Sequence, residues 1–332
     1  MMVKLDLKRD PTLEAADSAL EAIEVQRANR TYLGISGIGD CARKSYYRLH
    51  MVEEEPFGAD TLKNFADGHR TEDLVIERIR RVPGITLIDR DPETGKQLEV
   101  SDLNGHFLGH LDGEILGLIQ APKTWHVFEV KCTNDQGFAK FCKLKYDIGD
   151  EKQVLKAWNE TYYAQAQCYM HYRGHKRHYM VVASAGGRRW ESIRTNYSRK
   201  AAEWYVDRAR QIIQEPHIMP ARISDNPGNW VCKQFCGFHS VCHEGATPTR
   251  TCRTCCWSEA VEHGDWFCHR HQKILSTSEQ RAGCPDQRFR GAYVPGIVLE
   301  TNETTNTVIY RLNNGERWED KGARDDESIS TQ

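Results

Sequence analysis

The stretch His126-Val127-Phe128-Glu129-Val130-Lys131 decides the fold of this chain. It has the character of a short strand, and side chains alternate between the two faces of a strand. Glu129 and Lys131 therefore share one face, while Phe128 and Val130 lie on the other. An acid and an amine opposite an apolar face suit a strand whose polar side lines a cleft. The alternative is a surface strand with an ordinary Glu/Lys pair.

The stretch Gly109-His110-Leu111-Asp112-Gly113 supplies a second acid. Asp112 ends an extended segment, and a hairpin-like return over residues 117–124 would set it beside Glu129. Two carboxylates and a lysine at one point suit Mg²⁺ or Mn²⁺, because hard oxygen ligands favour these ions over zinc. Such a metal activates a bound water and offsets charge on a leaving oxygen. Lys131 would hold or deprotonate that water or stabilise the transition state, as phosphodiester hydrolysis requires.

Two helical motifs accompany these strands. The first, Gln165-Ala166-Gln167-Cys168-Tyr169, places Gln165 and Tyr169 on one helix face, because residues four apart are neighbours there. The same inward stripe is expected to include Val154, Trp158, Tyr162 and Tyr172. A core helix with an aromatic seam is the alternative. The second motif, Gly68-His69-Arg70-Thr71-Glu72, opens a helical run that continues to Arg81.

In this order the motifs resemble the RecB-like branch of the PD-(D/E)XK nuclease superfamily, over residues 31–245. That branch has an acid on one strand, a (D/E)-x-K strand next, and a helix with Q-x-x-x-Y. The resemblance implies a restriction-endonuclease-like α/β core, with a mixed central sheet flanked by helices. It also implies the site residues. Glu72, Asp112 and Glu129 would hold Mg²⁺ or Mn²⁺, with His69 as a weaker ligand candidate, Lys131 would serve the attacking water, and Gln165 and Tyr169 would position the strand or support the site.

The chain has twelve cysteines. Half of its first ten residues are charged, we expect no signal peptide, and no stretch approaches the ~20 apolar residues of a membrane span. We therefore expect a cytoplasmic protein of a bacterium or a phage-infected cell, with no membrane association. Clustered cysteines in such a chain are expected to bind metal rather than to form disulfides.

The first cysteine cluster consists of Cys232, Cys236 and Cys242, together with the isolated Cys41. One early and three late cysteines resemble the iron–sulfur nucleases related to AddB and to CRISPR-associated RecB-like exonucleases. The resemblance implies a 4Fe–4S cluster, held by thiolates, that pins the two ends of the domain together. The spacing here is C-x3-C-x5-C, whereas that family has C-x2-C-x5-C. Zinc and reduced free thiols are the alternatives.

The second cluster has the spacing of a zinc ribbon or zinc knuckle. Cys252-x2-Cys255 is followed, after twelve residues, by Cys268-x2-His271. We predict a Zn²⁺ site formed by these four residues. Cys256 and Cys284 are alternative ligands.

Basic residues dominate the segment from His171 to Arg222, where eleven of them face only four acids. Aromatic side chains interleave with these charges, a mixture that suits phosphate contacts and base stacking. The net charge of −2 over the whole chain argues against a non-specific DNA coat. A solvated strand-and-loop face is the alternative to DNA binding. The residues expected to contact DNA are Arg173, Lys176, Arg177, Arg188 and Arg189.

A length of 332 residues suits one core of about 200 residues with appendages. We expect an N-terminal helical segment (1–30), a nuclease core closed by the first cysteine cluster (31–245), a zinc-binding module (250–290), and a β-hairpin around Asn313-Asn314-Gly315 with a disordered tail (291–332).

The predicted function is metal-dependent DNA nuclease activity. Exonuclease action on DNA ends is favoured, by resemblance to nucleases of phage recombination, replication or repair. DNA is the expected partner, and a single-strand-binding or recombination protein is a further candidate. A catalytically silent nucleic-acid-binding protein and a cluster-based redox regulator are the alternatives.

Overall fold

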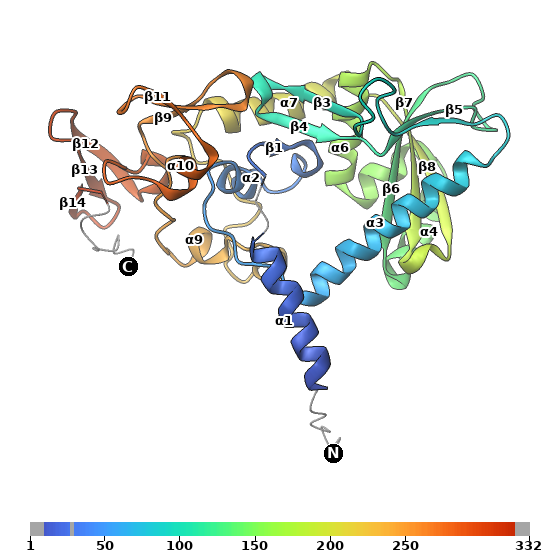
Figure 1. Cartoon of the computed structure of the whole chain (residues 1–332), viewed down its shortest axis with the longest axis horizontal. Helices are drawn as coiled ribbons and strands as arrows, with labels where there is room; N and C mark the ends of the chain where they lie inside the picture. The colour runs from blue at the N-terminus through green and yellow to red at the C-terminus, as the bar shows by residue number, and fades with distance from the viewer. Residues whose placement is uncertain (1–9, 27–29, 323–332) are drawn as a thin grey trace.

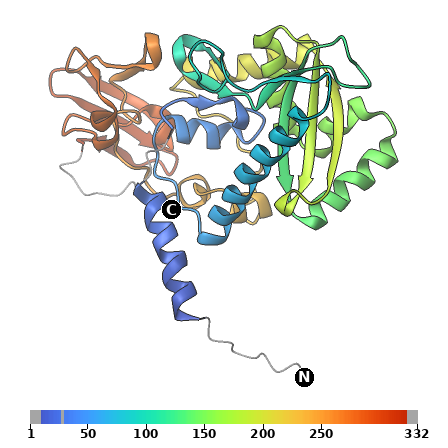
Figure 2. The ribbon, with the colours of Figure 1, turned by 45° about the vertical axis from the view of Figure 1, so that its right-hand side comes forward.

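The computed structural model describes residues 10–26 and 30–322, so the tail expected from Asp325 onward lies outside these ranges. Helix α1 (Pro11–Gln26) is the expected N-terminal helix, and it projects from the body of the molecule (Figure 1, Figure 2). Two contacts fasten it to α3 (Ala59–Arg80). Glu21 accepts a hydrogen bond from the backbone N–H of Ala59 (2.7 Å), and Asp17 pairs with Lys63 (2.6 Å).

A five-stranded mixed sheet forms the centre of the core, in the order β2-β5-β6-β7-β8. Its strands are β2 (Thr86–Ile88), β5 (Gly113–Leu116), β6 (His126–Thr133), β7 (Arg177–Ser184) and β8 (Trp190–Asn196). β6 and β7 run parallel, whereas the other neighbouring pairs run antiparallel. A parallel pair needs a long crossover, here made by α4 (Asp135–Ile148), α5 (Glu151–Trp158) and α6 (Glu160–Arg173). The expected mixed sheet flanked by helices is confirmed.

Helices cover both faces of this sheet. In Figure 2, α3 crosses one face, and there Val75 and Ile79 are buried together with Phe128 and Val130 of β6. The opposite face carries Val127 and is covered by α4, α5 and α6. Because Glu129 and Lys131 follow Val127 at two-residue steps, both project toward the α6 side.

The apolar stripe expected along one helix is divided between two helices that Asn159 separates. Asn159 has an extended backbone (φ −154°, ψ 109°), and its side chain accepts a hydrogen bond from the N–H of Tyr162 (3.0 Å). This is an N-cap of α6, a position that asparagine favours. The expectation of a single stripe was therefore wrong. Gln165 and Tyr169 lie on α6, whereas Val154 lies on α5.

Helix α3 begins at Ala59 rather than at Gly68, which corrects the expected start. Leu62 is buried and anchors the additional turns. Gly68 lies inside the helix, and no atom stands within 4 Å of the place where its Cβ would be. Glycine inside a helix costs about 1 kcal/mol relative to alanine, and tertiary packing outweighs that cost here.

A small sheet of order β1-β4-β3 lies beside the first and leads into Asp112. Its strands are β1 (Leu33–Gly34), β3 (Glu99–Asp102) and β4 (Phe107–His110). The 3₁₀ turns η1 (Ile35–Gly37) and η2 (Leu103–Gly105) follow β1 and β3, and α2 (Ala42–Leu49) begins soon after η1. Helix α7 (Arg199–Gln214), capped by Ser198, packs on α6 and α2.

The C-terminal part consists of short elements. Two small helices, α8 (Trp230–Phe235) and α9 (His239–His243), come first. A sheet of order β11-β10-β9 follows, with β9 (Ser258–Ala260), η4 (Glu262–Gly264), β10 (Trp266–Cys268) and β11 (Lys273–Leu275). Next come α10 (Thr277–Ala282), η5 (Gly291–Tyr293) and the strands β12 (Gly296–Asn302), β13 (Thr307–Leu312) and β14 (Arg317–Asp320). β13 and β14 form the hairpin expected around Asn313-Asn314-Gly315.

Within the described ranges, no helix combines the length and the apolar character needed to cross a membrane.

Candidate active site

Asp112 and Glu129 meet where β5 begins beside β6. Gly113 pairs with Phe128 in the antiparallel register, which sets Asp112 opposite Glu129. Asp112 Oδ2 accepts a hydrogen bond from the backbone N–H of Val130 (2.8 Å). This side-chain bond links the two strands just beyond their last backbone pair. The exposed fractions of Asp112 and Glu129 are 9% and 1%. Two acids from different strands are thus buried side by side.

Glu129 is held by one amine and one amide. Its Oε1 accepts hydrogen bonds from Lys131 Nζ and from Gln165 Nε2 (2.9 Å). Its Oε2 is buried and has no hydrogen-bond partner in the described part of the chain. Lys131 Nζ also lies 5.2 Å from the centre of the Tyr162 ring, a cation–π distance. The free carboxylate oxygen is the atom that a metal ion would satisfy.

Helix α6 connects both strands of the site. Gln165 reaches Glu129, and the Tyr169 hydroxyl donates to the carbonyl of His110 (2.7 Å), two residues before Asp112. Gln165 Nε2 lies 3.5 Å from the Tyr169 hydroxyl. Helix α6 lies close to the backbone of β4 at Gly109, where a Cβ would stand 2.7 Å from Tyr169 Cε1. A glycine at this position lets α6 hold the β4–β5 corner.

Glu72 approaches the two acids from α3. It is partly buried, and it interacts electrostatically with Asp112 and Lys131. His69, one turn earlier, is exposed, although its charge reaches Asp112. The structure therefore brings Glu72, Asp112, Glu129, Lys131, Gln165 and Tyr169 into one neighbourhood, with His69 at its edge.

The pKa values of all four ionisable side chains in this site differ from their ordinary values. Burial, and then the charge of Asp112, raise the pKa of Glu72 to about 7 and that of Glu129 to about 8. Burial also raises the pKa of Asp112. Burial acts to lower the pKa of Lys131, but the charges of Glu129 and Asp112 outweigh it and raise that pKa. When all four groups are ionised, three negative charges and one positive charge leave a net charge of −2, which a divalent cation would balance.

No three His, Cys, Asp or Glu side chains between residues 30 and 322, or along α1, lie close enough together to form a ready-made metal site. Asp112 and Glu129 are nonetheless a suitable pair of oxygen ligands, because they are adjacent, buried and mutually repulsive. Glu72, which interacts electrostatically with both acids, is the candidate for a third oxygen ligand. The donor set fits Mg²⁺ or Mn²⁺, which bind through carboxylates and retained waters.

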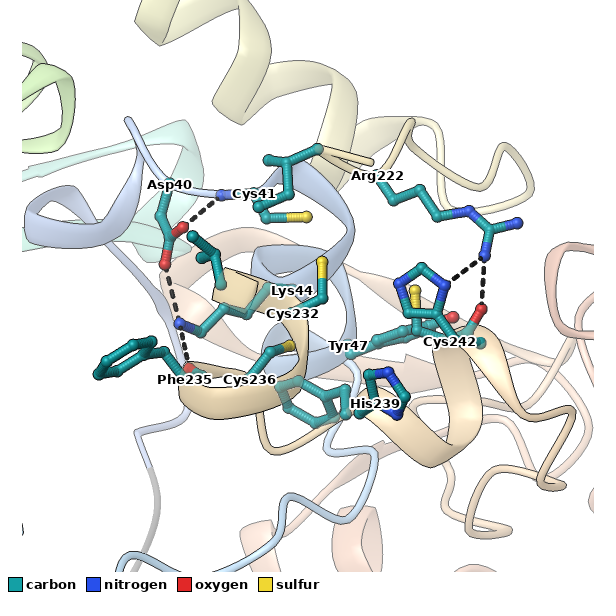
Figure 3. Close-up of a pocket in the computed structure, with 14 residues that line it drawn as sticks. Asp40, Cys41, Lys44, Tyr47, Arg222, Cys232, Phe235, Cys236, His239 and Cys242 are labelled. Atoms are coloured by element: carbon teal, nitrogen blue, oxygen red, sulfur yellow. Dashed lines mark hydrogen bonds and ion pairs between the residues drawn. The ribbon is translucent and has the colours of Figure 1, made fainter. Parts of the chain in front are cut away.

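The four cysteines of the first cluster line one pocket, shown in Figure 3. Cys41 caps the start of α2, Cys232 lies on α8, Cys236 follows α8 and Cys242 lies on α9. The space between the lining residues is about 400 Å³, part of it open to solvent. Burial, and then the neighbouring Cys41 and Cys242, raise the pKa of Cys232. Chain segments about 190 residues apart thus line one space with four cysteines, the residue type that binds an iron–sulfur cluster or a zinc ion, although no three of them form a ready-made metal site among the described residues.

The second cluster also surrounds a pocket, of about 220 Å³. Five of the six ligand candidates line it, namely Cys252, Cys255, Cys268, His271 and Cys284. The sixth, Cys256, does not, although its thiol hydrogen-bonds to Cys255.

The five basic residues expected to bind DNA form two groups at opposite ends of β7. Arg173 and Lys176 precede this strand, Arg177 begins it, and Arg188 and Arg189 follow it, about 25 Å away. Arg173 bonds both oxygens of Glu114 (2.7 and 3.0 Å), and Arg189 pairs with Asp135 (2.9 Å). These acids lie outside the basic segment, so the positive balance counted along that segment overstates its charge in the fold.

The group of Arg188 and Arg189 lies on the side of Glu72. The turn η3 (Ala185–Gly187), which precedes Arg188, packs on α3. A Cβ on Gly187 would stand 2.9 Å from Leu74 and 3.6 Å from Thr71, the residue before Glu72. Arg188 is exposed.

Tyr162 is the contact that the sequence interpretation missed, because it was assigned only to the core stripe. Its ring faces Lys131 Nζ. The signal was available, since Tyr162 lies three residues before Gln165 and such residues share a helix face.

No family model matches the chain, and no curated protein matches it in sequence. Among solved structures, an alkaline exonuclease from Laribacter hongkongensis (LHK-Exo) shares 13% identity at a TM-score of 0.38, over 60% of this chain and 92% of that chain. Its complex with dAMP gives 13% and 0.38, over 61% and 92%. The protein SSO0001 shares 14% identity at a TM-score of 0.37, over 70% of this chain and 96% of that chain. These likenesses are weak, and only the residues of the site itself bear on its function.

Proposed function

We propose that this chain is a divalent-metal-dependent nuclease that hydrolyses phosphodiester bonds in DNA, acting from DNA ends. The observation that carries the proposal is the convergence of Asp112, Glu129 and Lys131 on one buried point, with the second oxygen of Glu129 free. Full ionisation of this buried cluster, with its net charge of −2, is costly unless a cation is bound, and the raised pKa values of Glu72 and Glu129 reflect that cost. Phosphoryl transfer is chemistry that uses such a cation beside a lysine.

Glu72, Asp112 and Glu129 would hold the ion, Mg²⁺ or Mn²⁺. When bound, it supplies charge neutralisation at the phosphate and lowers the pKa of a water. Lys131 would orient the attacking water, and its contact with the Tyr162 ring keeps its amine at the site. Gln165 fixes the carboxylate of Glu129, and Tyr169 fixes the chain before Asp112.

Of the five basic residues expected to bind DNA, Arg188 and Arg189 follow the turn that packs on α3, the helix that carries Glu72, and we assign them to the DNA strand close to the cleavage point. Arg173, Lys176 and Arg177 would contact DNA farther along, if at all, because Glu114 already neutralises Arg173. The pocket of Cys41, Cys232, Cys236 and Cys242 would hold a 4Fe–4S cluster that pins α2 to α8 and α9. Zinc is the rival occupant. In this proposal the metal group in the cysteine pocket has a structural role, because hydrolysis itself needs no electron transfer.

The test is a digestion assay on end-labelled linear DNA and closed circular DNA, with Mg²⁺ or Mn²⁺ and anaerobically purified protein. We expect linear DNA alone to be degraded. Lys131→Ala should reduce the rate by about 10³-fold or more, because it removes a charge at the transition state. Lys140→Ala, which changes an exposed lysine on α4, is the matched control and should keep full activity.

Cleavage of both substrates would make the protein an endonuclease instead. Retained DNA binding with no cleavage under either metal would support the silent binding protein and overturn the proposal. Lys131→Met, which keeps the aliphatic stem, distinguishes a lost amine from a lost fold when the two variants are compared by thermal unfolding.

A further inference from the structure

We propose that Cys252, Cys255, Cys268 and Cys284 together bind one Zn²⁺ ion, and that the buried Arg253 and Arg290 balance the charge of this site. The inference is independent of nuclease activity. It replaces His271 of the expected ligand set by Cys284, and it leaves Cys256 outside the set.

The backbone brings these four cysteines around one pocket. Cys252 and Cys255 lie on a tight turn, in which the N–H of Cys255 donates to the carbonyl of Cys252 (3.1 Å). Cys268 ends β10, which pairs with β9 directly after that turn. Cys284 follows the end of α10. All four residues line the same space of about 220 Å³.

The fourth ligand is decided by what lies next to each candidate. Cys284 lines the pocket with the other three cysteines and interacts electrostatically with Cys252, Cys255 and Cys268. His271 is exposed, and its Nε2 lies 3.5 Å from Asp286 and 3.7 Å from the sulfur of Cys284. His271 lines the pocket as well, but its contacts with Asp286 and with the Cys284 sulfur suit a residue that supports a ligand, as residues around a metal site commonly do.

Two buried arginines provide the independent observation. Arg253 and Arg290 are 0% and 1% exposed. Arg253 donates to Gln280 Oε1 and to the carbonyls of Thr31 and Leu49, all neutral groups. Arg290 donates to the carbonyl of Arg253 and to the carbonyl and hydroxyl of Ser258. Across residues 30–322, no carboxylate forms an ion pair with either guanidinium.

Each guanidinium also lies over the Trp266 ring, at 4.5 Å for Arg253 and 6.0 Å for Arg290. Burying two cations without a counter-ion is costly even so, and a nearby negative charge would offset that cost. Four thiolates around Zn²⁺ carry a net charge of −2, which balances two guanidinium groups. A site of three cysteines and one neutral histidine would carry only −1. Arg253 directly follows Cys252 in the chain, and Arg290 interacts electrostatically with Cys255 and Cys256. The charge balance therefore favours Cys284 over His271.

Arg253 also fastens the module to the core. Arg253 holds the carbonyls of Leu49 and Thr31, and the Thr251 hydroxyl donates to the carbonyl of His50 (3.1 Å). His106, from the small sheet, contacts the carbonyl of Val261 through its Nε2 (2.7 Å). Zinc at this site would thus stabilise the attachment of the C-terminal module as well as the module itself.

The test is zinc quantification by mass spectrometry on the purified full-length chain. Whatever metal the first cysteine cluster holds, Cys284→Ser should contain one zinc equivalent less than wild type. Cys256→Ser and His271→Ala are the matched controls, and each should keep the wild-type zinc content. Wild-type zinc in Cys284→Ser, or loss of one equivalent in His271→Ala, would overturn the assignment.

A second measurement covers the case in which Cys284→Ser does not fold. Wild-type protein is alkylated before and after zinc removal by a chelator, and modified peptides are mapped. Cys252, Cys255, Cys268 and Cys284 should become reactive together on zinc removal; independent reactivity would contradict a shared ion. The Arg290→Met protein should release zinc to the chelator about tenfold faster than wild type, as expected when a supporting group is lost. A release rate equal to that of wild type would show that Arg290 does not support the zinc site.

Discussion

At the scale of single residues, Glu129 is the side chain on which the site depends. It is fully buried, one oxygen is bonded by Lys131 and Gln165, and the other has no partner among the described residues. The sequence predicts this residue well because strand alternation and the return from Asp112 are both local. It does not predict which of Cys284 and His271 is the better ligand, because the loop around α10 decides their relative positions.

The raised pKa of Glu72 leads to a prediction about pH. Its pKa of about 7 in the folded chain lies above the ordinary value of 4.5. The folded state thus binds more protons than the unfolded state between these values, and metal-free protein should lose stability as pH rises from about 5 to 8. Because Glu72 is partly exposed, its share is about 1–2 kcal/mol.

Thermal unfolding of Glu72→Gln and wild type in EDTA at pH 5 and pH 8 measures this share. The variant should show the smaller decline, and saturating Mg²⁺ should remove most of the decline in wild type. Equal pH dependence of the two proteins would show that Glu72 does not titrate in this range. Glu77→Gln, an exposed acid on the same helix, is the control.

Tyr169→Phe should lower both stability and cleavage rate. The change leaves the carbonyl of His110 without its hydrogen bond, which costs about 1–3 kcal/mol. The same loss frees the chain before Asp112, so kcat should fall more than substrate binding. Tyr172→Phe is the matched control, because Tyr172 lies on the same helix and its hydroxyl donates to Asp102 (2.8 Å) away from the site. An equal fall of kcat in both variants would contradict a positioning role for Tyr169.

At the scale of elements, the sheet was predictable and the helix break was not. β4, β5 and β6 follow from apolar alternation and from turn residues, which act within a few positions. Asn159 interrupts the crossover helices without interrupting the spacing of apolar residues, so the pattern continues across the break. Only the cap geometry at Asn159 reveals it.

Gly109→Ala should disturb the contact between β4 and α6. The new Cβ would stand 2.7 Å from Tyr169 Cε1 and 2.8 Å from Ile35 Cβ, inside the packed core. Overpacking of this kind costs about 1–3 kcal/mol. Gly68→Ala is the matched control on α3, where a Cβ meets open space, and it should stabilise the protein by up to about 1 kcal/mol. Denaturant unfolding of both variants measures the difference, and a stable Gly109→Ala would mean that α6 can withdraw from β4 at little cost.

At the scale of the whole molecule, distant segments are joined at places that no local pattern marks. Arg173 forms an ion pair with Glu114 only because β5 and the end of α6 are neighbours in the fold. The cysteine pocket of α8 and α9 likewise takes Cys41 from the other end of the core, a grouping that the resemblance to iron–sulfur nucleases implied and that spacing alone did not. Spacing predicts that cysteines bind together, but their partners in space come from the assembled chain.

Cys236→Ala should lower the melting temperature of anaerobically purified protein by about 5 °C or more, because a bound metal group contributes its binding energy to folding. Cys142→Ala, on α4 and outside both cysteine pockets, is the control and should cost much less. The two variants are compared by calorimetry together with iron and zinc content. A Cys236→Ala protein as stable as wild type would show that this pocket does not pin the core.

Helix α2 joins the two cysteine pockets. It is about 12 Å long, it begins at Cys41 in the first pocket, and its last carbonyl, that of Leu49, accepts a hydrogen bond from Arg253 beside the second. If both pockets hold metal, their binding equilibria share this helix and are thermodynamically linked. An oxidant that destroys the first centre would then weaken zinc binding at the second. By the reciprocity of coupled equilibria, zinc at the second would protect the first to the same degree.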